Sequence, residues 1–338
     1  MEDRDRDRYS RQIRFPGIGL PGQQRLLDAR VAIVGCGALG SFHAAALLRA
    51  GVRRLVLVDR DYVELNNLQR QWLYDQEDAE RARPKVEAAA HHLRRIDSKC
   101  QAEPVAADLT AGNIAEVLDG VELMLDGTDN FETRYLINEF AVERGIPWIY
   151  GAAIGSYGIS MPIVPGSTCC FSCLYPQPPA GIQPTCETAG VVNVLTSSIA
   201  SFQVSIALQI LCERGFEFRI TTIDLWSGKL RQIRQPGARP DCEVCGLRRF
   251  SHLESRSRAP ISLCGRNAVQ IHDRGRSVNL VLLKQRLLPL GEVRANELAL
   301  RFFLPPYEMT IFQDGRAIVK GTTDVGIARS LYAQYVGS

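Results

Sequence analysis

Two Cys-x-x-Cys pairs are the most specific chemical signal in this 338-residue sequence. Cys170 and Cys173 form the first pair, and Cys242 and Cys245 form the second. Four thiolates that share one ion describe a closed, structural zinc site, so we predict that Zn²⁺ ties a mid-chain loop to the end of its domain. Cys169 adjoins the first pair and is an alternative ligand to Cys170. A redox pair of the thioredoxin type is the competing interpretation, but a proline shortly after Cys173 argues against the helix that such a pair requires.

A glycine-rich turn is the second chemical signal. The segment Gly35-Cys36-Gly37-Ala38-Leu39-Gly40 follows a β-branched run and leads into a helix rich in Ala and Leu. A second β-rich run then ends in Asp59, 19 residues after Gly40. In a dinucleotide-type βαβ unit of this order, the glycines let backbone N–H groups approach a phosphate, and the acid holds ribose hydroxyls. We therefore expect an adenine nucleotide, although this motif alone fits a nicotinamide or flavin dehydrogenase equally well.

The polar residues that follow Asp59 favour ATP. The segment Asn66-Asn67-Leu68-Gln69-Arg70-Gln71 supplies amide and cationic groups close to the ribose end of the site. A triphosphate needs such groups because of its charge, whereas a dehydrogenase does not need them at this point. Pro84 and Lys85 open the next helix, where a cation in the first turn opposes the helix dipole unless an anion lies nearby. A lysine that faces solvent is the alternative for Lys85.

Two aspartates follow another predicted strand, at residues 121–125. The segment Asp126-Gly127-Thr128-Asp129-Asn130 comes at its carboxyl end, where ligands lie in open α/β sheets. Mg²⁺ bound to phosphates uses one or two carboxylates, so these acids can hold a magnesium ion. The alternative is turn and N-cap chemistry for the next helix, at residues 131–143. Of the two acids, Asp126 at the strand end fits the structural role better.

The elements that must position these residues alternate between strands and helices. We predict an α/β fold with a Rossmann-like mixed, largely parallel sheet, helices on both faces and the zinc site as a staple. The chain divides into an arm at residues 1–28, the nucleotide-binding domain with the zinc site at 29–250, a linker at 251–260 and a small α/β domain at 261–338. The charged head, residues 1–8, is expected to be solvated. In the last domain we expect strands at 268–272, 297–303, 307–312 and 316–320 and helices at 278–287 and 324–335.

The composition is that of an ordinary soluble globular protein. Hydrophobic residues make up 46% of the sequence, charged residues make up 23%, and the net charge is +3. For this length, such a charge does not argue for nucleic-acid binding. We expect no secretory signal and no apolar run long enough to span a membrane, so the expected compartment is the cytoplasm. In that compartment paired cysteines bind metal more often than they form disulfides.

Taken together, the motifs resemble the MoeB/ThiF family, which contains bacterial relatives of ubiquitin-activating enzymes. The resemblance runs from about Arg8 to Gly246, with every motif in order. The motifs that carry it are Arg8-Tyr9-Ser10-Arg11-Gln12, the glycine-rich turn, Asp59-Arg60-Asp61, Asn67-Leu68-Gln69-Arg70-Gln71, Pro84-Lys85, Asp126-Gly127-Thr128-Asp129-Asn130, Thr185-Cys186-Glu187-Thr188-Ala189-Gly190 and the two Cys-x-x-Cys pairs. Ala38 and Gly127 depart from the family pattern, which often has a glycine and a cysteine at these positions.

The resemblance implies ATP-dependent adenylylation of the C-terminal glycine of a ubiquitin-fold sulfur carrier that ends in Gly-Gly. Such a carrier serves molybdopterin biosynthesis, thiamine biosynthesis or tRNA thiolation. The resemblance also implies a homodimer, because Arg11 would reach into the partner subunit's site. By the same resemblance, Asp59 would hold the ribose and Asp129 would hold the Mg²⁺. The phosphates would be bound by Asn67, Arg70 and Lys85, with Asn66 and Asn130 nearby. Cys186 would be the thiol of a mobile crossover loop. No general base is required, because the attacking carboxylate is already ionised at neutral pH.

Two other functions stay open at this point: an NAD-dependent oxidoreductase and a non-catalytic scaffold that binds a ubiquitin-like protein. Cys186 takes a covalent role in some family members and is dispensable in others. The domain at 261–338 lies outside the minimal family domain and is too short for the rhodanese domain that some members carry. Binding of the carrier or of a sulfur donor such as a cysteine desulfurase is its candidate role.

Overall fold

Two β-sheets organise the described chain, and each belongs to its own compact unit. The computed structural model describes residues 1–177, 189–213, 215, 217–254, 261–263, 268–272, 278–296, 299–313 and 315–337. The larger unit contains residues 1–177 and 190–254 of this set, and the smaller unit contains the described residues from 261 onward.

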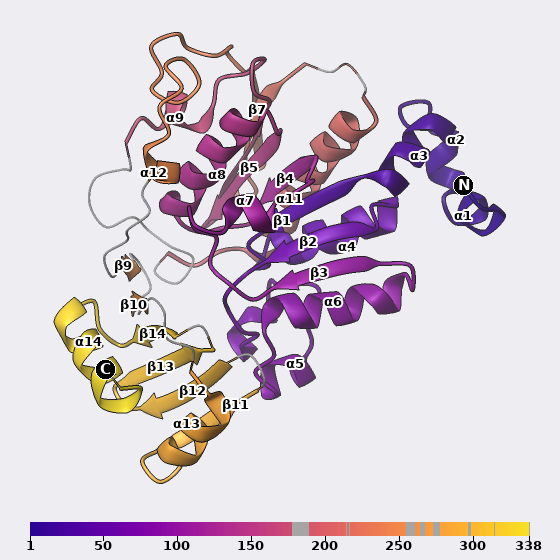
Figure 1. Ribbon diagram of the computed structural model, residues 1–338. Helices are drawn as coiled ribbons and strands as arrows, with labels where there is room; N and C mark the ends of the chain where they lie inside the picture. The colour runs from indigo at the N-terminus through magenta and orange to yellow at the C-terminus, as the bar shows by residue number, and fades with distance from the viewer. Residues whose placement is uncertain are drawn as a thin grey trace. The chain divides into compact units, whose positions relative to one another are not determined.

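The larger unit is built on an eight-stranded sheet with the strand order β3-β2-β1-β4-β5-β6-β7-β8 (Figure 1). The strands are β1 (Arg30–Val34), β2 (Arg54–Val58), β3 (Gln101–Val105), β4 (Leu123–Asp126), β5 (Trp148–Ile154), β6 (Tyr157–Ile163), β7 (Arg219–Asp224) and β8 (Lys229–Arg234). Strands β1 to β5 pair in parallel, and β6, β7 and β8 continue the sheet in antiparallel pairs. The predicted mixed, largely parallel sheet is confirmed.

Both faces of the central strands are apolar because helices cover both. In β1, Val31 and Ile33 belong to one core and Ala32 and Val34 to the other, as the two-residue repeat of a strand requires. The first core also contains residues of α3, α4, α6 and α11, and the second contains residues of α7 and α8. These helices are α3 (Gly19–Asp28), α4 (Gly40–Ala50), α6 (Lys85–Ile96), α7 (Ile114–Val117), α8 (Phe131–Arg144) and α11 (Asn193–Leu211).

The N-terminal head is mostly exposed, as expected of a solvated segment, but it is helical and anchored through Asp5. It forms α1 (Asp3–Arg8), which is followed by α2 (Ser10–Arg14). Asp5 is only 5% exposed, and its Oδ1 lies 2.6 Å from Nη2 of Arg53. Arg53 also pairs with Asp97, at 2.8 Å. The alternating charges of the head therefore find partners far along the chain, which the local sequence does not reveal.

Helix α11 is long and apolar enough to cross a membrane by length and composition, contrary to our expectation that the chain has no such segment. It packs against α4, β5 and β6 within the larger unit. Its residues Ile199 and Ala207 are completely buried in that packing. These contacts are those of a central helix in a globular core.

The connections of the larger unit contain short helices. They are η1 (Leu65–Asn67), α5 (Gln76–Glu80), α9 (Phe171–Leu174) and α12 (Ser251–Glu254). Helix α12 occupies the first four residues of the predicted linker. The carboxylate of Glu139 in α8 accepts hydrogen bonds from the backbone N–H groups of His252 and Leu253, at 2.8 and 3.0 Å. This part of the predicted linker is therefore held in the larger unit, and residues 255–260 lie outside the described residues.

The smaller unit is an antiparallel sheet with the strand order β11-β12-β13-β14-β10-β9. Its elements are β9 (Ile261–Leu263), β10 (Ala268–His272), α13 (Leu280–Leu287), β11 (Glu292–Ala295), β12 (Ala299–Leu304), β13 (Tyr307–Phe312), β14 (Arg316–Lys320) and α14 (Val325–Tyr335). Leu283 of α13 and Leu331 of α14 share one core with Phe302 of β12, so both helices cover the same face. The predicted small α/β domain is confirmed, with β9 and β11 as additional strands.

Candidate active site

The glycine-rich turn packs against the loop that follows β4. Gly35 has a φ of +88°, and a Cβ on it would lie 2.6 Å from the carbonyl of Gly127. A Cβ on Gly40 would lie 1.8 Å from the carbonyl oxygen of Gly35, so both positions require glycine. A Cβ on Gly37 would meet only an ordinary contact, 4.0 Å from Nε2 of Gln71. The turn therefore leaves room at Gly37, where an anion can approach the backbone at the start of α4.

Asp59 lies directly after β2, beside the glycine-rich turn. One of its carboxylate oxygens accepts a hydrogen bond from the backbone N–H of Cys36 at 2.7 Å, and the other accepts one from the backbone N–H of Asp61 at 2.8 Å. Burial raises the pKa of the Asp59 carboxyl, and the nearby ammonium of Lys85 opposes that shift. A carboxylate has about four acceptor positions, so Asp59 can still accept hydrogen bonds from ribose hydroxyls.

Lys85 is buried, so the alternative of a lysine that faces solvent is wrong. It is the first residue of α6 and follows Pro84, as predicted. The residue is 6% exposed, and its Nζ lies 3.2 Å from Oδ2 of Asp61. The carboxylate of Asp61 therefore supplies the negative charge that stabilises a cation at this helix N-terminus.

The polar segment after β2 folds into the short helix η1 and the turn that follows it. Asn67 is buried, and its Oδ1 accepts a hydrogen bond from the backbone N–H of Glu64 at 3.1 Å. Its Nδ2 donates to Oδ1 of Asn66 at 2.7 Å. Arg70 donates from Nη1 to the carbonyl of Asn66 at 2.9 Å. Two of the predicted phosphate-binding residues, Asn67 and Arg70, are thus held in one segment through their contacts with Asn66.

Two further side chains lie beside the glycine-rich turn: Tyr74, which was not singled out from the sequence, and Gln71, which was named only as part of the polar segment. Tyr74 donates a hydrogen bond from its hydroxyl to the carbonyl of Cys36 at 2.7 Å. Gln71 is 3% exposed, and its Oε1 has no hydrogen-bond partner among the described residues. The position of Gln71 at the end of the polar segment was a usable signal, whereas nothing in the sequence marked Tyr74.

Asp126 takes the structural role predicted for it. It is completely buried and accepts hydrogen bonds from the backbone N–H and the hydroxyl of Thr128, at 2.8 and 2.6 Å. Its Oδ2 lies 3.0 Å from Nε of Arg134. Burial raises the pKa of the Asp126 carboxyl, and Arg134 and Thr128 oppose that shift. These contacts fix the loop in which Asp129 stands.

Asp129 and Asn130 differ in what their side chains do. Asp129 is exposed, so its carboxylate is accessible to a hydrated cation. Asn130 is the N-cap of α8, and its Oδ1 accepts a hydrogen bond from the backbone N–H of Thr133 at 2.8 Å. The N-cap alternative is therefore correct for Asn130, while its predicted contact with the nucleotide stays a prediction.

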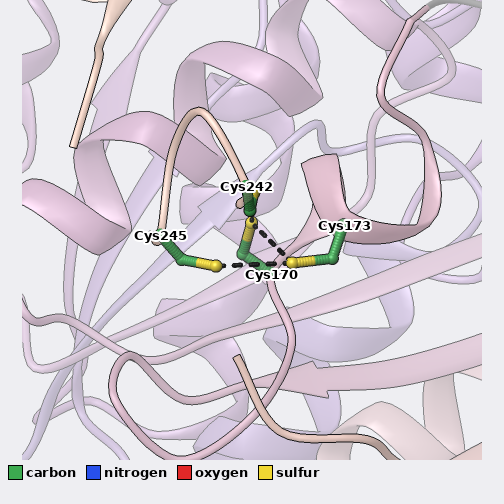
Figure 2. Close-up of side chains that lie close together, drawn as sticks. All are labelled: Cys170, Cys173, Cys242 and Cys245. Carbon is green, nitrogen blue, oxygen red and sulfur yellow. Dashed lines mark hydrogen bonds between the residues drawn. The ribbon is translucent and has the colours of Figure 1, made fainter. Parts of the chain in front are cut away.

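The four predicted zinc ligands form one cluster, with their sulfur atoms close together (Figure 2). The Sγ of Cys170 lies 3.7 Å from that of Cys173 and 3.6 Å from that of Cys242. The Sγ of Cys173 lies 3.3 Å from that of Cys245. A tetrahedral Zn²⁺ with bonds of about 2.3 Å places its sulfur ligands about 3.8 Å apart. The cluster therefore fits zinc, and it joins α9 to the segment that follows β8.

The neighbours of the cluster agree with this assignment. The hydrogen bond between Cys170 and Cys173 lowers the pKa of the Cys173 thiol and raises that of the Cys170 thiol. Cys169 lies apart from the cluster, and both its carbonyl and its Sγ accept from Nε2 of Gln235, at 3.2 and 3.6 Å. Of the two adjacent cysteines, Cys170 is thus the one in position to bind the ion.

The geometry at the carboxyl edge of the sheet does not test the roles of Arg11 and Cys186. Arg11 is exposed on α2, where its Nη1 donates to Oγ of Ser10 at 3.0 Å. Cys186 lies outside the described residues. The role predicted for each of them therefore stays a prediction.

Comparisons with known proteins agree with the arrangement of these residues. A family model described as the ThiF family matches residues 9–244. A sulfur carrier protein ThiS adenylyltransferase of Bacillus subtilis is 41% identical over 335 residues, which are 98% of this chain and 99% of the relative. The protein of the same name in Escherichia coli is 38% identical and covers 73% of this chain and 97% of its own length.

More distant proteins share the fold. The SAMP-activating enzyme E1 of Haloferax volcanii is 37% identical over 71% of this chain and 88% of its own length. The crystal structure of E. coli MccB superposes with a TM-score of 0.63 at 20% identity, over 73% of this chain and 74% of that one. At that identity the likeness concerns the fold alone. From the family match and the identity to full-length relatives, the chain belongs to the ThiF family.

Proposed function

We propose that this protein is an ATP-dependent adenylyltransferase that activates the C-terminal glycine of a ubiquitin-fold sulfur carrier. One observation carries the proposal: the glycine-rich turn packs against Gly127, in the loop that follows β4, and the backbone of the same turn donates a hydrogen bond to Asp59. A phosphate site, a ribose acid and a cation-binding loop are thereby supported on one edge of one sheet. The names of the relatives in B. subtilis and E. coli support the same activity.

The reaction needs charge stabilisation more than acid–base chemistry. A carboxylate oxygen of the carrier attacks the α-phosphorus of ATP, the bond from that phosphorus to the bridging oxygen breaks, and pyrophosphate leaves. Lys85 and Arg70 would stabilise the negative charge on the phosphate oxygens, and Arg11 would add a third cation. The exposed carboxylate of Asp129 would hold Mg²⁺, which neutralises charge on the departing phosphates when bound. The products are a carrier acyl-adenylate and pyrophosphate.

A second subunit would complete the site. Arg11 is exposed on α2, and beside it Phe15 is 61% exposed at the end of the same helix. A guanidinium next to an exposed aromatic ring is a composition that fits a subunit interface. We therefore infer a homodimer in which Arg11 of each subunit serves the other subunit's site.

A carrier of the thiamine pathway is the first substrate to test. The two relatives named for ThiS share 41% and 38% identity with this chain. The B. subtilis relative also matches along nearly the whole chain, whereas a pig relative named adenylyltransferase and sulfurtransferase MOCS3 is matched over only 60% of its length. A molybdopterin carrier is the second substrate class, because that relative is 36% identical.

The sulfur-transfer part of the function rests on Cys186 and on an outside donor. The thiolate of Cys186, on the predicted crossover loop, would attack the carbonyl carbon of the acyl-adenylate and form a thioester while AMP leaves, so this step can only follow adenylylation. A cysteine desulfurase is the donor class that we infer from the chemistry. An enzyme that uses ATP and a sulfur carrier fits the cytoplasmic location expected from the sequence.

The deciding experiment is ATP–pyrophosphate exchange with purified protein, Mg²⁺ and each candidate carrier. We expect exchange with a carrier of the ThiS type that ends in Gly-Gly and none with the same carrier lacking its last glycine. Substitution K85A should abolish exchange while carrier binding persists, which excludes a non-catalytic scaffold. Absence of exchange with every carrier, together with binding of NADH, would instead support the oxidoreductase alternative.

A further inference from the structure

The carboxylate of Asp61 forms an ion pair with the ammonium group of Lys85. Its Oδ2 lies 3.2 Å from Nζ of Lys85, and its Oδ1 lies 3.8 Å from Nε of Arg60. Arg60 in turn pairs more closely with Asp108, at 2.7 Å. The side chain of Asp61 is 22% exposed and that of Lys85 is 8% exposed, so the cation is the more buried member of the pair.

The backbone around this pair is fixed independently of the ion pair. The backbone N–H of Lys85 donates to the carbonyl of Asp61 at 2.9 Å, and that of Val63 donates to the carbonyl of Arg83 at 2.9 Å. A β-bridge joins Tyr62 and Pro84 in the same region. The main chains that carry Asp61 and Lys85 are therefore tied together, and only the ammonium group needs to move for Lys85 to change partners.

We propose that Asp61 is an exchangeable counter-ion: its carboxylate holds the Lys85 ammonium in the free enzyme and releases it to the phosphates of ATP. Asp61 is thus a positioning residue that competes with the phosphates for one cation. The inference rests on the proposed function, because it assumes that Lys85 binds phosphate.

The physical reason for the exchange is the cost of a buried, unpaired cation. Lys85 stands in the first turn of α6, where the helix dipole disfavours positive charge. Without Asp61, the free enzyme would hold this ammonium away from water with a weaker set of partners. With Asp61 present, the cation is stabilised before ATP arrives and again after pyrophosphate leaves. The ion pair therefore lowers the affinity for pyrophosphate and favours its release.

The substitution D61N separates the charge of this residue from its shape. An asparagine keeps the size of the side chain and the backbone hydrogen bonds, but it removes the charge that competes with phosphate. We expect the Kd of pyrophosphate, measured by calorimetry with Mg²⁺ present, to fall by at least about fivefold. The Kd of adenosine, which has no phosphate, should stay unchanged. The kcat should fall while the KM for ATP also falls, because product release becomes slower.

The matched control is D108N, which removes the same charge from the acid that pairs with Arg60. This variant should bind pyrophosphate as the wild-type protein does, since the ion pair of Asp108 is with Arg60. Equal or weaker pyrophosphate binding by D61N would overturn the exchange, and parallel losses for pyrophosphate and adenosine would give Asp61 a purely structural role. In both cases carrier-dependent exchange by the wild-type protein would leave the proposed function standing. A wild-type protein that neither binds ATP nor shows exchange would overturn the proposed function and this inference together.

Discussion

The guanidinium of Arg134 is buried against the carboxylate of Asp126, with Nε 3.0 Å from Oδ2. Its Nη2 donates to the carbonyls of Thr128 and Gly151, at 2.6 and 3.2 Å, and its Cζ lies 5.0 Å from the ring centre of Tyr150. One cation from α8 thereby binds the end of β4, the loop after it and the middle of β5. The loop that presents Asp129 is held from inside the protein.

Substitution R134M is expected to lower the free energy of unfolding by about 3–5 kcal/mol. It removes one partner of a buried ion pair and leaves the Asp126 carboxylate without its counter-charge. Urea unfolding followed by circular dichroism measures this loss, and pyrophosphate exchange should fall as well because the loop loses its support. The control is R144M on the same helix, where the side chain is 56% exposed and a change within about 0.5 kcal/mol is expected. Equal stability of the two variants would contradict the role of Arg134.

His43 should make stability fall as the pH drops from about 6.5 to about 4. Burial lowers the pKa of this completely buried histidine to about 4, below the ordinary value of 6.5. Between these values the unfolded chain binds a proton that the folded protein excludes, so the folded state is favoured above pH 6.5 and loses that advantage on acidification. The loss attributable to His43 is roughly 3 kcal/mol.

Urea unfolding between pH 7 and pH 4.5 tests this with the variants H43Q and H91Q. Nε2 of His43 lies 2.9 Å from Oε1 of Gln203, whose Nε2 donates to the carbonyls of Asp126 and Ile149. A glutamine at position 43 can supply the same donor without titrating, so H43Q should show a weaker pH dependence than the wild type. His91 is exposed, and H91Q should keep the wild-type slope. An unchanged slope in H43Q would contradict the assignment.

Local spacing was sufficient to predict the features of the site that are set by neighbouring residues. The glycine-rich turn, the acid that follows β2 and the two Cys-x-x-Cys pairs lie where the sequence placed them, because turn geometry and metal geometry limit which residues fit. The structural role of Asp126 was also predictable from its position at the end of a strand. The short edge strand β11 was missed, since four alternating residues after a loop carry little periodic signal.

Long-range contacts account for what could not be predicted. The partner of Asp5 is Arg53, and the partner of His43 is Gln203, 160 residues away in the chain. The identity of a charged or polar residue in the sequence does not indicate which distant residue it will contact. The ion pair of Lys85 with Asp61 belongs to the same class, because only the fold decides whether an ammonium group meets water or a carboxylate.

If Cys170 and not Cys169 binds the zinc ion, substitutions at these two adjacent cysteines should have different effects on zinc content. We expect purified protein to contain about one zinc ion per chain, and C170S to lose most of it and several kcal/mol of stability. Substitution C169S should keep the zinc, because the Sγ of Cys169 contacts Gln235 and lies apart from the cluster. Metal analysis and thermal unfolding measure both effects. Loss of zinc from C169S with retention in C170S would reverse the assignment.

Mixed dimers test whether Arg11 serves the partner's site. The variants R11A and K85A should each be inactive alone, since each lacks one of the cations around the phosphates. If subunits exchange at random, half of the dimers contain one of each variant and have one intact site, so roughly a quarter of the wild-type activity should return.

A mixture of K85A with D129A is the control for this experiment. Both of these substitutions damage the site of their own subunit, so no mixed dimer has an intact site and no activity should return. Recovery in the first mixture alone requires that Arg11 and Lys85 of one site come from different chains. If neither mixture recovers activity although native mass spectrometry shows mixed dimers, Arg11 acts within its own subunit, whereas full activity of R11A alone would show that Arg11 has no role. Arg11 is exposed on α2, and the neighbouring Gln12 binds the carbonyl of Ala50 at the end of α4 opposite the glycine-rich turn, which is the structural reason to expect recovery.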